Sequence, residues 1–337
     1  MKFVLIVFFL MTFLASCKTV KHRQPEFSSG QLESVFPDDQ ARQQFIAMSR
    51  SVIRLTSFVN YQLSIFEIGS QVTLDMAEDT SVLAKIRARV NRNESFSGTA
   101  FIIAQDDSSM FLMTCAHTVS FPDTIISWDN KADADGDRFV LSIARKTSSL
   151  VQAAFPERAV KMKVVIIDES SDLALLQAEN IAGNVNPLSA AHKLCADLQW
   201  GDKLWIAGFP TGRFMLTTGV AGKSGSDGVF ATDAPLSEGY SGSPVMVYDI
   251  EAKRFGLAGV ARSVPAKALY VLKPEFEIHE MQYNPAIPYT GPVYAATDYR
   301  SVAGVSLVVS SEKVASLMQK AGFVLKDNKW MKVAAVK

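Results

Sequence analysis

The sequence is poor in features that several classes of protein need. It has three cysteines among its 337 residues, and one of them, Cys17, lies close to the N-terminus. The other two allow at most one disulfide, which excludes a small scaffold held together by disulfides. Positive charge is not in excess either, because 34 Lys and Arg balance 34 Asp and Glu. A neutral chain lacks the basic surface on which nucleic-acid binding usually depends, so we expect no nucleic-acid partner.

Long apolar runs are also rare, and the one that exists lies at the N-terminus. It covers residues 3–14, behind Lys2, and is shorter than the roughly 20 apolar residues of a membrane-spanning helix. The run is followed by LASC, which closes with Cys17 and resembles the bacterial lipoprotein box. That resemblance implies a signal peptide over residues 1–16, lipid attached to Cys17, and a polar tether over residues 17–37. An ordinary secretory signal with a cysteine there by chance is the alternative.

Lipid on Cys17 would hold the protein on a bacterial membrane, facing away from the cytoplasm. Residue 18 is Lys rather than Asp. By the sorting rule of bacterial lipoproteins, this favours the outer membrane and the periplasm in a cell that has an outer membrane. We therefore expect a lipid-anchored protein of the bacterial cell envelope. The sequence leaves the oligomeric state open.

Short strand-like segments separated by turn residues follow one another from residue 97 onward. Examples are TAFIIA, FLMT, LALL, KLWIAG and VMVY. This spacing predicts an all-β protein built of barrels or sandwiches rather than of alternating strands and helices. Two helices are expected in addition, over residues 38–50 and 311–321, and residues 80–92 are expected to form a helical insertion.

Three short motifs contain residue types that together carry out acyl transfer. Ser241 lies in GYSGS, where Gly239 and Gly242 allow a tight turn that exposes the hydroxyl beside main-chain amide donors. His117 follows a strand in TCAH, and Asp172 precedes the apolar strand LALL, as expected of a buried acid that orients a histidine. Each motif alone is more often a simple turn or strand end. Their conjunction, in the order His, Asp, Ser on an all-β chain, predicts a catalytic triad.

These segments resemble the trypsin-like serine peptidases of the chymotrypsin fold, nearest to the HtrA/Deg-like and glutamyl-endopeptidase-like branches. The resemblance covers about residues 97–320 and rests on SGTAFIIA, FLMTCAHTV, SSDLALLQ, GDKLWIAGFPTG, TDAPLSEGYSGSPV and GLAGVARS. It implies an all-β fold of two six-stranded antiparallel β-barrels with a C-terminal helix. The N-terminal segment and first barrel would occupy residues 38–185, and the second barrel with the closing helix residues 186–323. Residues 324–337 would be a C-terminal tail.

The same resemblance assigns roles to the motif residues. Ser241 would be the nucleophile, His117 the general base and then the general acid, and Asp172 the residue that orients His117. The main-chain amides of Gly239 and Ser241 would form the oxyanion hole. The substrates would be proteins or peptides, and neither a cofactor nor a metal is implied.

The expected substrate preference depends on positions around the nucleophile. Ala261 and Arg262 would lie on the strand that lines the substrate groove, and Ala261 stands where glutamyl-specific relatives carry histidine. Pro235 stands where an acid would favour substrates with Arg or Lys. We therefore expect a small or medium apolar residue before the cleaved bond. Tyr240 stands where relatives usually have Asp or Asn, which supports the alternative of an inactive pseudoprotease that binds peptides in the cell envelope.

Two further features leave alternatives open. Cys115 and Cys195 could pair in an oxidising compartment, although a free Cys115 acting as a small buried apolar residue is the default. Residues 263–300 form a long segment beside the expected site. Such a segment is either a lid or binding loop, or a packed excursion of the surface.

Overall fold

The computed structural model of the protein describes residues 33–333, except residues 68, 79, 134–135, 156, 180–185, 193–196, 264–265, 275–285, 292 and 303. The predicted signal peptide, the lipid site at Cys17 and the second body cysteine, Cys195, lie outside the described residues. The fold below is that of one compact unit, which covers residues 38–337. Among the described residues, no helix has the length and apolar character needed to cross a membrane.

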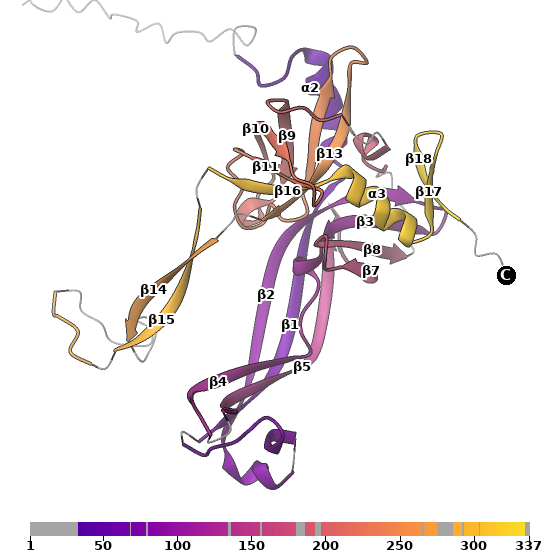
Figure 1. The fold of residues 1–337 in the computed structure, drawn as a ribbon. Helices are drawn as coiled ribbons and strands as arrows, with labels where there is room; N and C mark the ends of the chain where they lie inside the picture. Colours follow the sequence, from indigo (N-terminus) through magenta and orange to yellow (C-terminus); the bar gives the residue numbers. More distant parts are fainter. Residues whose placement is uncertain are drawn as a thin grey trace, which may run out of the picture. The chain divides into compact units, whose positions relative to one another are not determined.

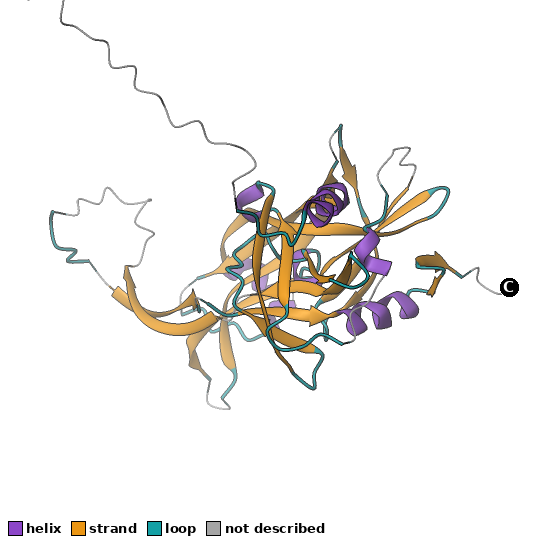
Figure 2. Cartoon of the chain, turned by 90° about the horizontal axis from the view of Figure 1, so that it is seen from above, coloured by secondary structure: helices purple, strands orange, loops and turns teal. Residues whose placement is uncertain are grey.

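The N-terminal half of this unit forms one antiparallel sheet, and strands dominate the whole unit (Figure 2). The sheet order is β4-β5-β1-β2-β3-β8-β7, with β6 paired to β5. Its eight strands are β1 (Val52–Phe66), β2 (Ile86–Gln105), β3 (Ser109–Cys115), β4 (Thr124–Ala132), β5 (Arg138–Ala154), β6 (Ala159–Lys161), β7 (Lys163–Asp168) and β8 (Leu173–Glu179).

The first sheet has eight strands, where six were predicted, and three of its strands are unusually long. β1, β2 and β5 contain 15, 20 and 17 residues and run side by side (Figure 1). β1 pairs with β2 from Val52 opposite Phe101 to Phe66 opposite Ile86. Near the far end of these strands, Phe66, Val72, Val82 and Ile143 form a small core of their own. The fold class is nevertheless the predicted one, all-β and chymotrypsin-like.

The helix predicted over residues 80–92 is wrong for most of its length. Residues Thr80–Lys85 form a short 3-10 turn, η3, after another, η2 (Met76–Glu78), and strand β2 begins at Ile86. The segment IRARV alternates in the strand period, since Ile86 is half-buried whereas Arg87 is exposed. Pairing with β1 supplies the main-chain hydrogen bonds, so tertiary contacts override the helical propensity of the segment.

The C-terminal half of the unit contains the second barrel, which is closed and six-stranded as predicted. Its order is β10-β11-β16-β13-β12-β9. The strands are β9 (Lys203–Gly208), β10 (Met215–Ser224), β11 (Val229–Thr232), β12 (Pro244–Asp249), β13 (Arg254–Ser263) and β16 (Ser306–Ser310). Leu204, Ile206, Val245 and Val308 are among its fully buried core residues.

A two-stranded ribbon lies between β13 and β16 in the chain. It consists of β14 (Ala266–Pro274) and β15 (Val293–Ser301), which form a sheet of their own (Figure 1). Tyr270, Leu272 and Tyr299 are 87%, 73% and 72% exposed. One alternative for residues 263–300 was a segment packed against the protein surface. The exposure of these side chains argues against that alternative for β14 and β15. Residues 275–285, between the strands, lie outside the described residues.

The two predicted terminal helices are present. α2 (Asp39–Ser49) begins after Asp38, whose carboxylate accepts a hydrogen bond from the amide of Ala41 at 2.7 Å, as an N-cap does. α3 (Ser311–Lys320) follows β16 and ends before Gly322, which has φ +82°.

The residues after α3 form a hairpin, where a tail was expected. β17 (Phe323–Lys326) pairs with β18 (Lys329–Lys332), and the Trp330 side chain is buried. Its indole N–H donates to the main-chain carbonyl of Ala191 at 3.1 Å. The hairpin is therefore fixed to the body of the unit by a buried aromatic side chain.

Candidate active site

His117 and Asp172 are brought together by neighbouring strands of the first sheet. β3 ends at Cys115, and His117 lies in the 3-10 turn η4 (Ala116–Thr118) that follows. β8 begins at Leu173, directly after Asp172. Because β3 and β8 pair antiparallel, with Cys115 opposite Leu173, the end of one strand meets the start of the other. The topology thus places the predicted base beside the predicted acid.

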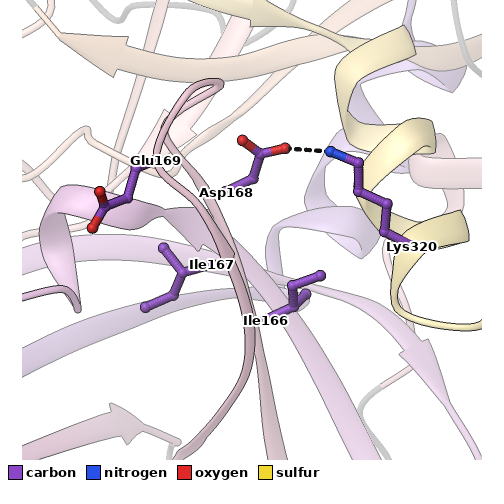
Figure 3. Close-up of a pocket in the computed structure, with 5 residues that line it drawn as sticks. All are labelled: Ile166, Ile167, Asp168, Glu169 and Lys320. Carbon is purple, nitrogen blue, oxygen red and sulfur yellow. Dashed lines mark hydrogen bonds and ion pairs between the residues drawn. The ribbon is translucent and has the colours of Figure 1, made fainter.

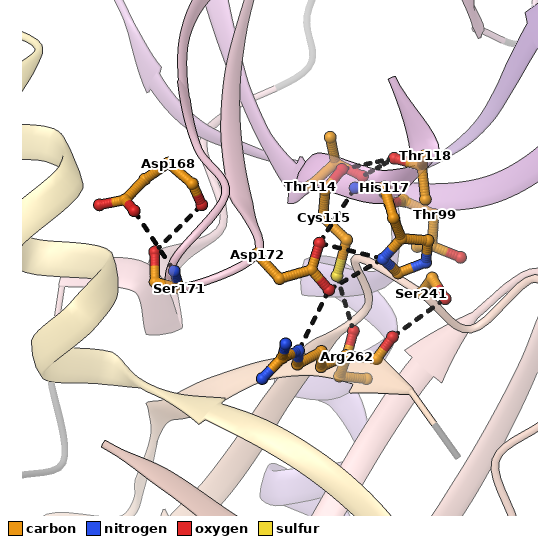
Figure 4. A network of polar contacts seen from close by, with 11 residues as sticks. Thr99, Thr114, Cys115, His117, Thr118, Asp168, Ser171, Asp172, Ser241 and Arg262 are labelled. Atoms are coloured by element: carbon orange, nitrogen blue, oxygen red, sulfur yellow. Dashed lines mark hydrogen bonds and ion pairs between the residues drawn. The ribbon is translucent and has the colours of Figure 1, made fainter. Parts of the chain in front are cut away.

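The His117 imidazole and the Asp172 carboxylate are joined by several short contacts (Figure 4). His117 Nδ1 lies 2.8 Å from Oδ2 and 3.0 Å from Oδ1 of Asp172, and the His117 amide donates to Oδ1 at 3.0 Å. Burial raises the pKa of Asp172, but the hydrogen bonds and charge of His117 and the charge of Arg262 leave that pKa below its ordinary value. An ionised Asp172 favours the tautomer with the proton on Nδ1, which leaves Nε2 as a base.

Ser241 lies in the loop between β11 and β12, and buried packing holds this loop in place. Tyr240, the residue before it, is 3% exposed and packs in the core of the second barrel. Gly239 and Gly242 have φ values of +97° and +89°, which side chains strongly disfavour. A Cβ on Gly242 would also overlap the carbonyl oxygen of Thr99. Tyr240 therefore anchors the loop by apolar burial.

Two main-chain amides beside the Ser241 hydroxyl are free to bind an anion. Within the described part of the chain, the amides of Gly239 and Ser241 donate no hydrogen bond. By contrast, Tyr240 donates to Ser237 at 3.1 Å and Gly242 donates to Ala261 at 2.8 Å. A pair of unused donors next to a hydroxyl is what the predicted oxyanion hole needs.

The sequence of this region matches a known family. Residues 98–252 match the family described as trypsin-like peptidase domain, and the range includes His117, Asp172 and Ser241. Residues 98–252 are a trypsin-like peptidase domain. No curated protein matches the chain.

Two solved structures also match the chain, both at low sequence identity. Rv3671c from M. tuberculosis H37Rv, solved in an inactive form, is 17% identical, with a TM-score of 0.43 over 86% of this chain and 96% of that chain. The serine endoprotease from Yersinia pestis is 14% identical, with a TM-score of 0.43 over 87% of this chain and 69% of that chain. The roles assigned to residues of the peptidase domain therefore rest on its own geometry and not on these two structures.

Arg262, just beyond the matched range, contacts both Asp172 and Ser241 of the peptidase domain (Figure 4). Its Nε lies 3.3 Å from Asp172 Oδ2, and its carbonyl accepts the Ser241 hydroxyl at 3.1 Å. A β-bulge explains this double contact, because β13 pairs with β16 at Ala261 and Ser263 and skips Arg262. The sequence predicted Arg262 beside the substrate but not its bond to the acid.

Ala261, the other predicted groove residue, offers only its main chain to the site. Its side chain is 1% exposed and belongs to the core of the second barrel. Its carbonyl accepts from the Gly242 amide at 2.8 Å and from Cys115 Sγ at 3.2 Å, and its amide donates to Ser243 at 2.9 Å. The place of Ala261 on a substrate-lining strand stays a prediction.

Thr99 joins the two halves of the peptidase domain at the site, and the sequence analysis did not identify it. Its fully buried hydroxyl donates to the Gly239 carbonyl at 2.7 Å and accepts from the Phe209 amide at 3.0 Å. Its own amide donates to the Ser241 carbonyl at 2.8 Å, and its carbonyl accepts from Thr114 Oγ1 at 2.8 Å. In the sequence, the only indication of a role for Thr99 was that it is the one polar residue in the strand segment TAFIIA.

Cys115 is free and buried, close to His117 and Asp172. Burial raises the pKa of its thiol well above the ordinary value, so it remains protonated. Cys115, His117 and Asp172 offer ligand atoms within 4.8 Å of one another. The Asp172 carboxylate, however, is already shared by His117 and the cation of Arg262, an arrangement that disfavours a second cation there.

The turn that leads into Asp172 is tied to the C-terminal helix. Lys320 on α3 contacts Asp168 Oδ2 at 2.8 Å, above a shallow cavity of about 520 Å³ that Ile166, Ile167 and Glu169 also line (Figure 3). Asp168 further accepts from the Ser170 hydroxyl at 2.5 Å. The hydrogen bonds from Lys320 and Ser170 hold the pKa of Asp168 far below its usual range. Helix α3 thereby fixes the turn that leads into Asp172.

Proposed function

We propose that the protein is a serine endopeptidase that hydrolyses proteins or peptides through Ser241, His117 and Asp172. The observation that carries the proposal is the His117–Asp172 pair at 2.8 Å, which supplies an oriented base within a trypsin-like peptidase domain. The same domain contains a serine flanked by two unused amides. Each component of acyl transfer is therefore present on this chain.

The proposed reaction has two halves. The Ser241 hydroxyl turns toward His117, Nε2 takes its proton, and Oγ attacks the carbonyl carbon of the substrate. Asp172 stabilises the imidazolium, while the amides of Gly239 and Ser241 bind the oxyanion. His117 then gives the proton to the leaving amine, and the acyl group remains on Ser241. A water, deprotonated by His117, attacks this ester and releases the acid and the free hydroxyl.

Hydrolysis of an unfolded casein-like protein tests this proposal. Ser241→Ala should lower the rate by about 1,000-fold or more, because the nucleophile is lost. Ser237→Ala is the matched control, since its hydroxyl is exposed on the same loop and takes no part in the reaction. It should remain within a few-fold of wild type. Full activity in Ser241→Ala would refute the proposal.

We further propose that lipid on Cys17 tethers the peptidase to the bacterial cell envelope, outside the cytoplasm. The support is the apolar run that ends in LASC. Cys17→Ala should abolish labelling of the protein by a radioactive or clickable fatty acid and release it from membranes. Unchanged labelling in that variant would contradict the tether.

A second candidate function is a pseudoprotease that binds extended peptides without cleaving them. One observation favours it, because the Ser241 hydroxyl bonds to the carbonyl of Arg262 and not to His117. Tyr240 at the position before the nucleophile points the same way. A fluorophosphonate probe separates the two functions, since only an activated serine reacts. Peptide binding without labelling would establish the pseudoprotease.

A further inference from the structure

The guanidinium of Arg262 contacts Asp172, the acid of the proposed triad. Arg262 Nε and His117 Nδ1 lie 3.3 Å and 2.8 Å from the same oxygen, Asp172 Oδ2. The Asp172 side chain is 11% exposed and that of Arg262 is 33% exposed, so this contact is only partly screened by water. The Asp172 carboxylate therefore contacts both the Arg262 guanidinium and the His117 imidazole.

The other charged and titratable groups around Asp172 are accounted for. Cys115, beneath the pair, has a thiol that burial keeps neutral. On the turn before Asp172, Asp168 is bound to Lys320, and Glu169 accepts from the Ser120 hydroxyl at 3.2 Å. Among the described residues, Arg262 is the one Lys or Arg side chain in contact with Asp172.

A cation on the acid has a direct consequence for the base. An isolated carboxylate beside an imidazole favours the protonated ring, in which the imidazole cannot accept the serine proton. A fixed positive charge on the other side of that carboxylate opposes the ring proton. The guanidinium of Arg262 and the ring of His117 therefore compete for the same carboxylate oxygen.

We infer that Arg262 is a positioning residue that sets the pH range in which His117 acts as a base, by sharing the Asp172 carboxylate with it. The inference rests on the proposed function, because it assigns regulation to the same site. It goes beyond it by giving Arg262 a role that acts through Asp172, where the sequence placed Arg262 against the substrate. The β-bulge at Arg262 provides the local geometry for this role.

The pH dependence of hydrolysis tests the inference with three variants. Arg262→Gln removes the charge but keeps a hydrogen-bonding side chain, and should move the acid limb of the kcat/KM profile up by about half to one pH unit. Arg262→Lys keeps a charge near Asp172 and should restore the limb toward its wild-type position. Arg254→Gln, on an exposed residue at the start of the same strand, makes the same charge change and should leave the limb in place.

A merely structural role gives a different result. Loss of packing at Arg262 would lower the rate equally at every pH and leave the limb where it is in wild type. Coincident acid limbs for Arg262→Gln and wild type would overturn the inference. If wild type hydrolyses nothing and reacts with no fluorophosphonate, it is the proposed function that fails.

A titration that needs no activity keeps the inference testable in that case. The His117 ring can be followed by ¹⁵N NMR as the pH is lowered, with its signal assigned by comparison with His117→Gln. His117 in Arg262→Gln should take up its proton at a pH about half to one unit higher than in wild type. An unchanged protonation midpoint, in a variant whose circular dichroism shows the native fold, would overturn the inference whatever the activity.

Discussion

The Ser241 hydroxyl donates its hydrogen bond to the main-chain carbonyl of Arg262, at 3.1 Å. In the proposed mechanism, this hydrogen has to be redirected toward His117 before Ser241 can attack. A neutral hydrogen bond of this kind is worth only about 0.5–1.5 kcal/mol net. Enzymes lower barriers by about 8 kcal/mol or more, so this resting contact is too weak to prevent catalysis.

Asp172→Asn should leave the fold intact and lower kcat by about 10,000-fold. The amide cannot fix the His117 tautomer with Nε2 free. Asp172 has φ +55°, a conformation that Asn also tolerates, so the backbone should not change. Steady-state kinetics on a peptide substrate, with circular dichroism as the control for folding, measure this. A loss of less than ten-fold would show that Asp172 does not orient the base.

Thr99→Val should lower both stability and activity. The variant keeps the shape of the side chain but leaves the Gly239 carbonyl and the Phe209 amide without their partner. Unpaired groups of this kind cost about 1–3 kcal/mol each. Urea unfolding and kcat/KM measure the two effects. Thr99→Ser, which restores the hydroxyl, should recover most of the activity, and an active, fully stable Thr99→Val would show that this link is dispensable.

Gly242→Ala should destabilise the protein by at least about 2 kcal/mol and inactivate it. Its positive φ disfavours a side chain, and a Cβ would overlap the Thr99 carbonyl. Gly201→Ala is the matched control, because Gly201 has φ +92° with no atom within 4 Å of the added Cβ. It isolates the backbone strain, about 1 kcal/mol, and should remain active. Equal thermal unfolding of the two variants would exclude a role for the close contact with Thr99.

The His117–Asp172 pair and the glycine turn at Ser241 could be predicted from sequence because each lies in a short local motif. The local geometry follows from the glycines around Ser241, the strand before His117 and the strand after Asp172. The order His, Asp, Ser along the chain then indicated that the three residues act together. The contacts of Thr99 and Arg262 could not be predicted in this way. They depend on where two distant segments approach each other and on a bulge that skips one residue, and neither leaves a periodic pattern.

The same limit explains the elements that differ from prediction. Residues 86–92 have residues of good helix propensity, yet β1 offers them a complete strand edge, and pairing determines the outcome. The hairpin at 323–332 depends on the burial of Trp330 against Ala191, a contact that local sequence does not specify. The length of β1, β2 and β5 could not be predicted either, because it depends on the pairing of these three strands with one another.

Lys320→Met should weaken the anchor of the Asp172 turn in a pH-dependent manner. The pKa of Asp168 is lowered in the folded protein, chiefly by the hydrogen bond from Lys320. A depressed carboxyl pKa stabilises the fold fully above the unfolded value of about 3.9, and this contribution is lost progressively as the pH falls from there through the folded pKa. Since Lys320 is more than half exposed, the stability difference from wild type should be about 0.5–1 kcal/mol at pH 7.

The difference between wild type and Lys320→Met should shrink when urea unfolding is repeated at pH 3. Lys326→Met, on the exposed hairpin strand beyond α3, controls for the loss of a positive charge in this part of the chain and should show no such pH dependence. A difference that stays constant or grows toward pH 3 would contradict the role assigned to the ion pair.

Labelling with a fluorophosphonate probe, followed by mass spectrometry of the modified peptide, shows directly whether Ser241 is an activated nucleophile. We expect one stoichiometric adduct on Ser241 in wild type, none in Ser241→Ala, and strongly slowed labelling in His117→Ala. Labelling of Ser237→Ala should match that of wild type. An adduct on another residue, or no adduct on a folded wild-type protein, would contradict an activated Ser241 and with it the assignment of a serine peptidase.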